Sequence, residues 1–321
     1  MILINSCPTE RTTEMVIDWI EYLSPGARIV RVNSSNTITA LDVTLDHDGA
    51  GIAFTAGGTR IVLNEVSAYW YRRGEFLLQP AGRAVDEEMA RHLRREQDAV
   101  LGLLYHKLAA HPRHINSIHD TFINKLVVLE KAAARGLAVP DTWVTRSRQC
   151  LQQAMAQAGA LITKSASESP AVQQDGITFS VGTEQVATVD LEALTENLEP
   201  CKVQEQLAKR FEIRAFYLHG EWFAMAIFSQ QDETTKVDFR NYNHSRMNRM
   251  VPFLLPDAVR GKLSLLMQDL RLNSGSADLV YTTSGTYVFL EVNPVGQLGM
   301  VSYPCHYNLE KKIAQYLTQT S

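Results

Sequence analysis

Two carboxylates and an amide near the end of the chain are spaced so that they could hold a metal ion. Asp278 and Glu291 lie in two runs rich in β-branched and aromatic residues, which predict the two strands of a hairpin. Side chains alternate between the faces of a strand, so Asn293 emerges on the same face as Glu291. Carboxylates that face each other repel unless a cation lies between them, and oxygen ligands without a neighbouring His or Cys favour Mg²⁺ over zinc. The alternative is a solvated acidic edge with an incidental asparagine.

The turn between the two runs decides which residues face each other. We expect Ser284 and Gly285 to form a two-residue turn, which places Thr283 opposite Thr286. The same pairing, followed outward along the strands, places the two carboxylates directly opposite each other. The hypothesis of a metal site therefore depends on this register.

Two other stretches carry cations that could bind anions. The aromatic run 69–71 ends in Arg72 and Arg73, whose planar guanidinium groups suit carboxylates and phosphates. A surface strand end is the alternative there. Lys164 follows the apolar run 160–163 and precedes a loop of small residues, whose N–H groups and hydroxyls could contact phosphate beside the ammonium. Taken alone, this lysine could equally be an ordinary surface residue.

Composition places the chain among ordinary soluble proteins. Its 321 residues are 45% hydrophobic and 21% charged, which is enough for two or three packed units. A net charge of -4 gives no general attraction for nucleic acid, and neither a signal peptide nor a membrane span is indicated. The cysteines are dispersed, lack CxxC spacing and suggest reduced thiols in the cytoplasm: Cys7, Cys150, Cys201 and Cys305.

We expect a mixed α/β (α+β) chain with three domains. Residues 1–115 predict a small α/β domain, in which a long charged helix from Asp86 to about Leu108 suggests a domain or subunit contact, such as that of a homodimer. Residues 116–200 alternate predicted helices and strands and form a central lobe. Residues 201–321 are mostly predicted β-structure and contain the acidic hairpin.

The order of these polar and charged residues resembles that of the ATP-grasp superfamily, the fold of carboxylate–amine ligases. The similarity covers about residues 115–300. The stretches 69–73, 289–297 and 300–304 narrow the resemblance to the ATP-grasp peptide maturases that make graspetides, also called omega-ester-containing peptides. The C-terminal stretch is most similar to the grasp-with-spasm branch, in which the maturase is encoded beside a radical SAM enzyme with a SPASM domain.

This resemblance implies a binding site for ATP and Mg²⁺. It assigns Lys125 and Lys164 to the phosphates, Gln204, Glu205 and Leu207 to the adenine, Glu212 to the ribose, Arg240 and Asn241 to the triphosphate, and Asp278, Glu291 and Asn293 to Mg²⁺. The loop after Lys164 departs from the family pattern. It is rich in Ser and Ala where many relatives carry glycine, which lets a backbone approach phosphate closely.

The activity that the resemblance implies is ATP-dependent maturation of a ribosomally made precursor peptide with a leader and a core. An Asp or Glu side chain of the peptide would be activated as an acyl phosphate and then linked to a Ser or Thr hydroxyl as an ester, or to a Lys amine as an amide. Arg214 and Arg240 are the candidate catalytic residues. Arg214 shares a predicted strand face with Glu212, and it would either orient the acyl phosphate or pair with Glu212. Arg72 and Arg73 are candidate substrate contacts.

Two other functions stay open at this point. A carboxylate–amine ligase could use the same nucleotide site to join free amino acids or to extend a protein tail. A non-catalytic, nucleotide-dependent peptide-binding protein could retain the same shell of residues. The mass of the product separates the first of these from crosslinking, because a crosslink releases water whereas an added residue increases the mass.

Overall fold

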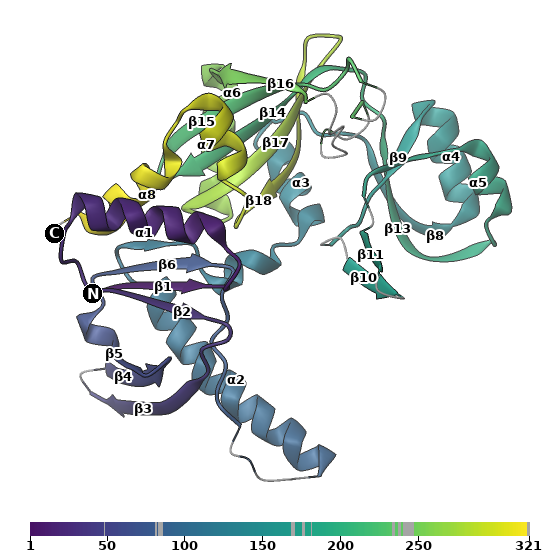
Figure 1. Cartoon of the computed structure of the whole chain (residues 1–321). Coiled ribbons are helices and arrows are strands. Elements are labelled where there is room, and N and C mark those ends of the chain that lie inside the picture. The colour runs from purple at the N-terminus through teal and green to yellow at the C-terminus, as the bar shows by residue number, and fades with distance from the viewer. Residues whose placement is uncertain are drawn as a thin grey trace. The chain divides into compact units, whose positions relative to one another are not determined.

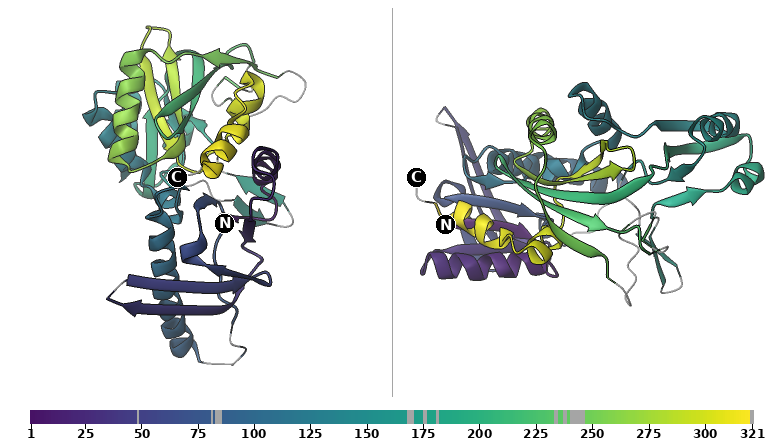
Figure 2. Two further views of the ribbon diagram at one scale, coloured as in Figure 1. Left: turned by 90° about the vertical axis from the view of Figure 1, so that its left-hand side faces the viewer. Right: turned by 90° about the horizontal axis from the view of Figure 1, so that it is seen from above.

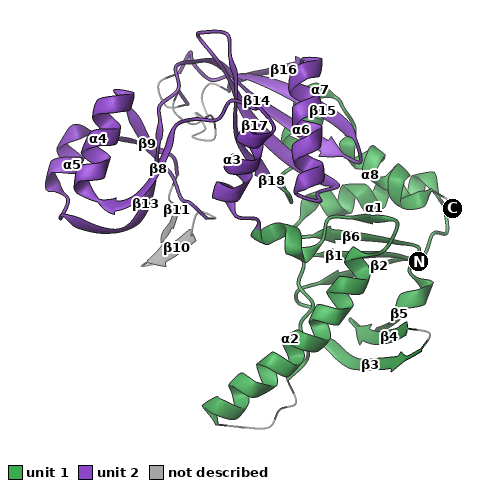
Figure 3. Cartoon of the chain, turned by 180° about the vertical axis from the view of Figure 1, so that it is seen from behind, with its two compact units in different colours: residues 1–122, 294–321 green, residues 123–293 purple. Residues whose placement is uncertain are grey.

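The computed structural model describes residues 1–47, 49–80, 82, 86–167, 171–174, 177–180, 182–232, 235, 236, 239 and 247–319, with only the backbone considered over 171–180. The chain divides into two compact units (Figure 3). Unit 1 contains residues 1–122 and 294–321, and unit 2 contains residues 123–293. The sequence pattern did not indicate that the C-terminal segment groups with the N-terminal part. The three-domain division, with boundaries at 115 and 200, stays a prediction.

Unit 1 is built on a sheet with helices packed against it. Its elements are β1 (Ile2–Ser6), α1 (Arg11–Leu23), β2 (Ile29–Asn33), β3 (Ile38–Asp46), β4 (Gly49–Ala56), β5 (Thr59–Val62), η1 (Leu63–Glu65), β6 (Ala68–Arg72), α2 (Glu87–Ala109), β7 (His114–Ile115), η2 (Ile118–Phe122), α7 (Gly299–Cys305) and α8 (Leu309–Thr318). The main sheet is parallel, in the order β2-β1-β6-β7 (Figure 1). β1 and β6 are buried along their whole length, as a parallel sheet covered on its faces requires.

The C-terminal helix closes unit 1. α8 packs along α1, and Figure 2 shows the two helices side by side. Leu309, Ile313 and Leu317 recur at helical spacing and are buried, so they form the apolar face of α8. Val16 and Ile20 are the corresponding buried residues of α1. The end of the chain therefore completes the core of the unit in which it begins.

Helix α2 confirms the predicted charged helix. Asp86 caps it by accepting a hydrogen bond from the backbone N–H of Met89, at 2.8 Å. Two glutamates in the first turn, and His106 and Lys107 in the last, suit the helix dipole. Most of its N-terminal half is exposed.

Unit 2 contains two antiparallel sheets. Its elements are α3 (Lys125–Ala134), β8 (Thr142–Ser147), α4 (Arg148–Ala158), β9 (Leu161–Thr163), β10 (Ala171–Gln174), β11 (Ile177–Ser180), β12 (Glu184–Val186), α5 (Thr188–Ala193), β13 (Asn197–Glu205), β14 (Lys209–Leu218), β15 (Glu221–Phe228), β16 (Arg249–Phe253), α6 (Asp257–Asp269), β17 (Ser274–Thr282) and β18 (Tyr287–Asn293). The larger sheet has the order β16-β15-β14-β17-β18 and shares its core with α3 and α6. The smaller has the order β12-β9-β13-β8 and packs against α4 and α5, while β10 and β11 form a separate hairpin.

The turn of the β17–β18 hairpin differs from the expected one. The N–H of Thr282 donates to the carbonyl of Thr286 at 3.0 Å, so the loop has three residues, 283–285. Gly285 has φ of +87°, a conformation that closes such loops and that glycine adopts without strain. The predicted pairing of Thr283 with Thr286 is therefore wrong by one position.

A β-bulge cancels this shift before the acidic residues are reached. Leu279 pairs with Phe289, but the next residue of β17, Asp278, pairs with Glu291. Leu290 is the extra residue on β18. The predicted pairing of Asp278 with Glu291 is confirmed, although the route to it includes an irregularity that the sequence pattern did not indicate.

None of the described helices combines the length and the apolar character needed to cross a bilayer. The four cysteines are free thiols, and only Cys305 is fully buried.

Candidate nucleotide and metal site

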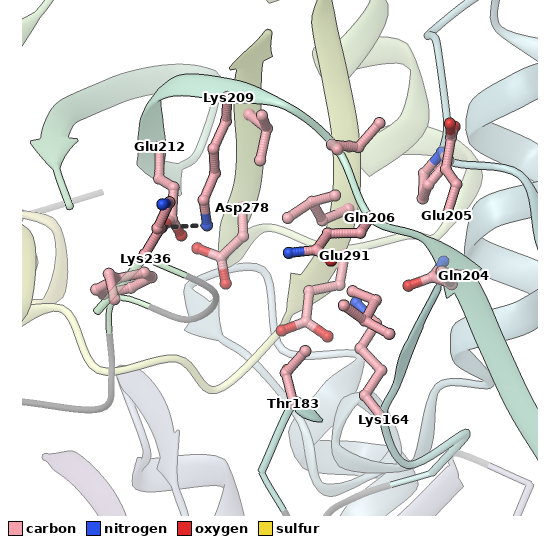
Figure 4. Close-up of a pocket in the computed structure, with 16 residues that line it drawn as sticks. Lys164, Thr183, Gln204, Glu205, Gln206, Lys209, Glu212, Lys236, Asp278 and Glu291 are labelled. Carbon is pink, nitrogen blue, oxygen red and sulfur yellow. Dashed lines mark hydrogen bonds and ion pairs between the residues drawn. The ribbon is translucent and has the colours of Figure 1, made fainter. Parts of the chain in front are cut away.

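Many of the predicted site residues line one pocket in unit 2 (Figure 4). Its walls come from β9, β13, β14, β17 and β18, and the space out to its open mouth is ≈ 710 Å³. Seven predicted residues line it: Lys164, Gln204, Glu205, Leu207, Glu212, Asp278 and Glu291.

The two carboxylates and the amide converge as predicted. The amide nitrogen of Asn293 donates to Asp278 Oδ2 at 3.2 Å and to Glu291 Oε1 at 3.3 Å. Both carboxylates are buried. The carboxylate oxygens fit Mg²⁺, and the Asn293 amide, whose nitrogen faces both carboxylates here, would present its oxygen to the ion after a flip of the amide. This donor set gives a thiol-seeking or imidazole-seeking metal no ligand. Among the described residues, no group of three or more His, Cys, Asp or Glu side chains is arranged to hold a metal, so the candidate site depends on two carboxylates and an amide.

Each carboxylate also has a cationic partner. Arg214, opposite Asp278 on the neighbouring strand β14, places Nη1 3.3 Å from Asp278 Oδ1 and 3.2 Å from Oδ2. Lys125, at the start of α3, lies with Nζ 3.5 Å from Glu291 Oε2. The sequence did not predict the contact between Arg214 and Asp278, because 64 residues separate them. These cations allow two buried carboxylates to stay close together.

Glu212 is held by a lysine and a serine of unit 2. Its Oε1 accepts hydrogen bonds from Lys209 Nζ at 2.7 Å and from Ser229 Oγ at 2.8 Å. Figure 4 shows Lys209 and Glu212 together at one end of the pocket, away from Lys164. Lys209 is a pocket residue that the sequence analysis missed. Its spacing of three residues from Glu212 gave no signal, because in a regular strand the two side chains point to opposite faces, and a register shift beside Lys209 brings them together.

A second missed cation is Lys202, on β13. Its side chain is only 3% exposed, and Nζ donates to the carbonyl of Ser165 at 2.8 Å, in the loop that follows Lys164. The pKa of Lys202 is lowered to about 8, mainly by burial and also by the nearby Lys164 and Lys125, while Glu291 opposes the shift. Strand alternation was the available signal, because Lys202 stands two residues before Gln204 and so shares its face.

Glu205 lines the pocket and also forms hydrogen bonds with the backbone of a neighbouring segment. Its Oε1 accepts a hydrogen bond from the backbone N–H of Asp141 at 3.0 Å, and its own N–H donates to the Asp141 carbonyl at 3.0 Å. Glu205 thereby fixes the end of β13 against the segment that enters β8. The remaining residue of this wall, Leu207, supplies apolar surface to the pocket.

Arg72 and Arg73 belong to unit 1 and share one carboxylate. Arg72 Nη2 and Arg73 Nη1 both lie 3.3 Å from Glu10 Oε2. Arg72 Nη1 also donates to the carbonyls of Val295 at 3.1 Å and Gly296 at 2.9 Å. Burial lowers the pKa of Arg72 to about 10, although Glu10 opposes the shift. Arg73 remains 40% exposed at its side chain.

Two predicted residues, Arg240 and Asn241, lie outside the described residues.

Sequence comparisons give no assignment, because no family model matches the chain and no curated protein matches it. Solved structures, in contrast, are similar over the whole chain. A RiPP-associated ATP-grasp ligase from Chryseobacterium gregarium, in complex with ADP and a leader and core peptide, has a TM-score of 0.80 and 20% identity, covering 98% of this chain and 96% of that chain. The macrocyclase MdnC from Microcystis aeruginosa MRC, bound with precursor peptide MdnA, has a TM-score of 0.75 and 24% identity, covering 100% of both chains. The ATP-grasp ligase PsnB, complexed with minimal precursor, Mg and ADP, has a TM-score of 0.70 and 17% identity, covering 98% and 96%.

These similarities establish the fold. The chain has the ATP-grasp fold, with its N-terminal α/β part, and the predicted fold class is confirmed.

Proposed function

We propose that the chain is an ATP-dependent peptide maturase. It activates Asp or Glu side chains of a ribosomal precursor peptide as acyl phosphates and links them to Ser or Thr hydroxyls as esters, or to Lys amines as amides. The observation that carries the proposal is the convergence of Asp278, Glu291 and Asn293, of which the two carboxylates line a pocket that also contains Lys164. The similar ligases that were solved with ADP, Mg or precursor peptides support this choice of ligands.

The phosphates of ATP occupy the cationic side of the pocket in this proposal. Lys125 and Lys164 contact them, Lys202 adds positive charge from beneath, and Arg240 and Asn241 approach the triphosphate. The carboxylates of Asp278 and Glu291 and the amide of Asn293 would hold Mg²⁺, which would neutralise phosphate charge and orient the triphosphate. This concentration of positive charge is needed because a peptide carboxylate and the γ-phosphate repel before they react.

The reaction itself balances without another reactant. A carboxylate oxygen of the peptide attacks the γ-phosphorus, the bond to the β–γ bridging oxygen breaks, and ADP leaves. A hydroxyl or amine of the same peptide then attacks the acyl carbon and displaces phosphate, which takes the proton. Each crosslink therefore removes one water from the peptide.

Arg214 and Arg240 act on the reacting groups in this proposal. Arg214 is anchored through Nη1 on Asp278, while its buried Nε has no hydrogen-bond partner among the described residues. A guanidinium fixed at one end and unsatisfied at another suits the role of orienting the acyl phosphate and stabilising charge at its carbonyl.

In this proposal, Arg73 contacts the peptide carboxylate, and Arg72 keeps Arg73 in position. Arg73 is the more exposed of the two, and Glu10 holds it beside Arg72. A planar, bidentate cation suits recognition of an Asp or Glu side chain before activation.

Mass spectrometry of a precursor peptide encoded beside this protein, after co-expression, tests the proposal. We expect a loss of about 18 Da per crosslink, set by the release of one water. A gain in mass would favour the carboxylate–amine ligase that extends a peptide. Failure to form ADP in the presence of the peptide would favour a non-catalytic peptide-binding protein.

We also propose a homodimer formed through α2. Met89, Leu93 and Val100 are exposed apolar residues spaced along this charged helix, and they continue the line of the buried Leu104. Light scattering should give twice the mass of one chain, and Leu93→Lys should convert the protein to a monomer. A wild-type monomer would remove the dimer from the proposal.

Two further expectations concern the cell rather than the site. We propose that the protein acts in the cytoplasm and that it is encoded beside a radical SAM protein with a SPASM domain. Sequencing of the genes on either side of its gene tests the second expectation.

A further inference from the structure

One buried acceptor in the pocket lacks a hydrogen-bond donor. Gln204, on β13, is only 1% exposed and lines the pocket. Its Nε2 donates to Thr142 Oγ1 at 2.8 Å. Its Oε1 is buried and has no hydrogen-bond partner among the described residues, and Figure 4 shows this oxygen directed toward the pocket. A buried acceptor without a donor is unfavourable, so the site is incomplete until a donor enters.

Proton counting fixes which end of the amide faces the pocket. Thr142 has a single hydroxyl proton, and it donates this proton to the carbonyl of Pro140 at 2.8 Å. The hydroxyl oxygen can then only accept a hydrogen bond from Gln204. A flipped amide would place Oε1 against an oxygen that has no proton left to donate. With the Thr142 proton on the Pro140 carbonyl, the amide oxygen of Gln204 faces the pocket.

Backbone pairing fixes the positions of Thr142 and Gln204. Thr142 and Gln204 are directly paired residues of the adjacent strands β8 and β13, so neither can shift without breaking the ladder. The neighbouring carboxylate of Glu205 turns back to the N–H of Asp141. Gln204 thus supplies the side-chain acceptor with which β13 can contact a ligand.

The surrounding surface suits a flat ring. Pro140, Ile162, Leu207 and Leu290 line the pocket with apolar groups. A planar heterocycle between them that carries an exocyclic amino group would satisfy the amide oxygen. A ring with a carbonyl at the same position would place two acceptors against each other and leave both unsatisfied.

We infer that Thr142 is a positioning residue that locks the Gln204 amide and thereby makes the site select 6-amino over 6-oxo purine nucleotides. The inference rests on the proposed function for its nucleotide site. Thr142 acts only through Gln204 and does not itself contact the base.

Binding of ATP and ITP without peptide, measured by isothermal titration calorimetry, tests this inference. ITP differs from ATP by the 6-oxo group that replaces the amino group. Wild-type protein should bind ATP about tenfold or more tightly than ITP, the value of one well-placed hydrogen bond with its mismatch. Thr142→Val keeps the shape of the side chain but frees the amide to flip, so we expect weaker ATP binding, tighter ITP binding and at least about a fivefold loss of preference.

Two further variants separate this role from a general structural one. Thr142→Ser retains the hydroxyl and should restore the wild-type preference. Thr145→Val makes the same chemical change on the same strand, at a residue that does not line the pocket, and should leave the preference unchanged. A Thr142→Val protein with wild-type preference would overturn the inference. Wild-type protein that binds no ATP would instead overturn the proposed function, so the two failures are distinct.

Discussion

Each unit contains a buried arginine on a β-strand that is paired with a carboxylate from another element. In unit 1, Arg72 pairs with Glu10 and donates from Nη1 to two backbone carbonyls, while its buried Nε, like that of Arg214, has no hydrogen-bond partner among the described residues. In unit 2, Arg214 pairs with Asp278, whose carboxylate lines a pocket and shares the amide of Asn293 with Glu291. A buried ion pair therefore does not mark a reactive site by itself. The access of one partner to a ligand makes the difference.

The largest expected effect is at the acidic wall of the pocket. Glu291→Gln keeps the shape of the side chain but removes the charge that pairs with Lys125 and that the proposed Mg²⁺ site requires. Crosslinking should fall by at least about 10³-fold because phosphate charge is no longer neutralised, while the protein stays folded. Mass spectrometry of the precursor measures the loss of water. Undiminished crosslinking would remove the metal from the proposed function.

The two arginines should respond differently to the same conservative change. Arg214→Lys retains the charge but loses the planar fork, so we expect a fall of about 10²-fold in kcat/KM from misplacement of the reacting groups. The matched variant Arg72→Lys should lower the melting temperature and cause a smaller kinetic defect, since Arg72 acts on the peptide only through Arg73 and its own hydrogen bonds go to the chain. Equal kinetic defects in the two variants would contradict the comparison.

The buried pair of unit 1 should control stability. Glu10→Gln leaves Arg72 buried without its counter-charge, and the free energy of unfolding should fall by about 3 kcal/mol at neutral pH. Burial alone would raise the pKa of Glu10, but Arg72 and Arg73 bring it below the usual 4.5. The carboxylate therefore stabilises the fold above pH 4.5, and this contribution is lost as the pH falls through the lowered pKa. Urea titrations at several pH values should show the two proteins converging in acid.

The smallest effect concerns Lys202. Its pKa of about 8 in the folded protein lies below the usual 10.5, so the unfolded chain binds more protons between these pH values. The stability of wild-type protein relative to Lys202→Met should therefore rise with pH across this window. Partial solvent screening reduces the expected change to about 1 kcal/mol. A constant difference between pH 7 and 10 would show that this cation is not disfavoured by burial.

The sequence predicted that Asp278, Glu291 and Asn293 converge, because the alternation of side chains along a strand is a local property. Asp278, Glu291 and Asn293 lie on neighbouring strands, and the period of two placed them on one face. The turn was predicted wrongly, because a three-residue loop and a two-residue turn differ by a glycine conformation that residue types alone do not decide. The correct pairing survived only because the bulge at Leu290 offset the error.

Strand alternation could not predict contacts between residues that are far apart in the sequence. Arg214 contacts Asp278 although 64 residues separate them, and Thr142 contacts Gln204 although 62 residues separate them. No local period connects these positions, since the order of strands in the sheets brings them together. Lys202 was accessible to the alternation rule, but a lysine in a strand usually reads as solvent-exposed.

The bulge at Leu290 also has a genetic consequence. In a regular strand, consecutive side chains point to opposite faces, yet Leu290 and Glu291 both line the pocket. A single-codon deletion of Leu290 should keep the acidic residues paired and remove one apolar wall, an outcome that no point substitution reproduces. Changes in chain length at this position, as well as changes in residue type, can therefore diversify what the protein accepts.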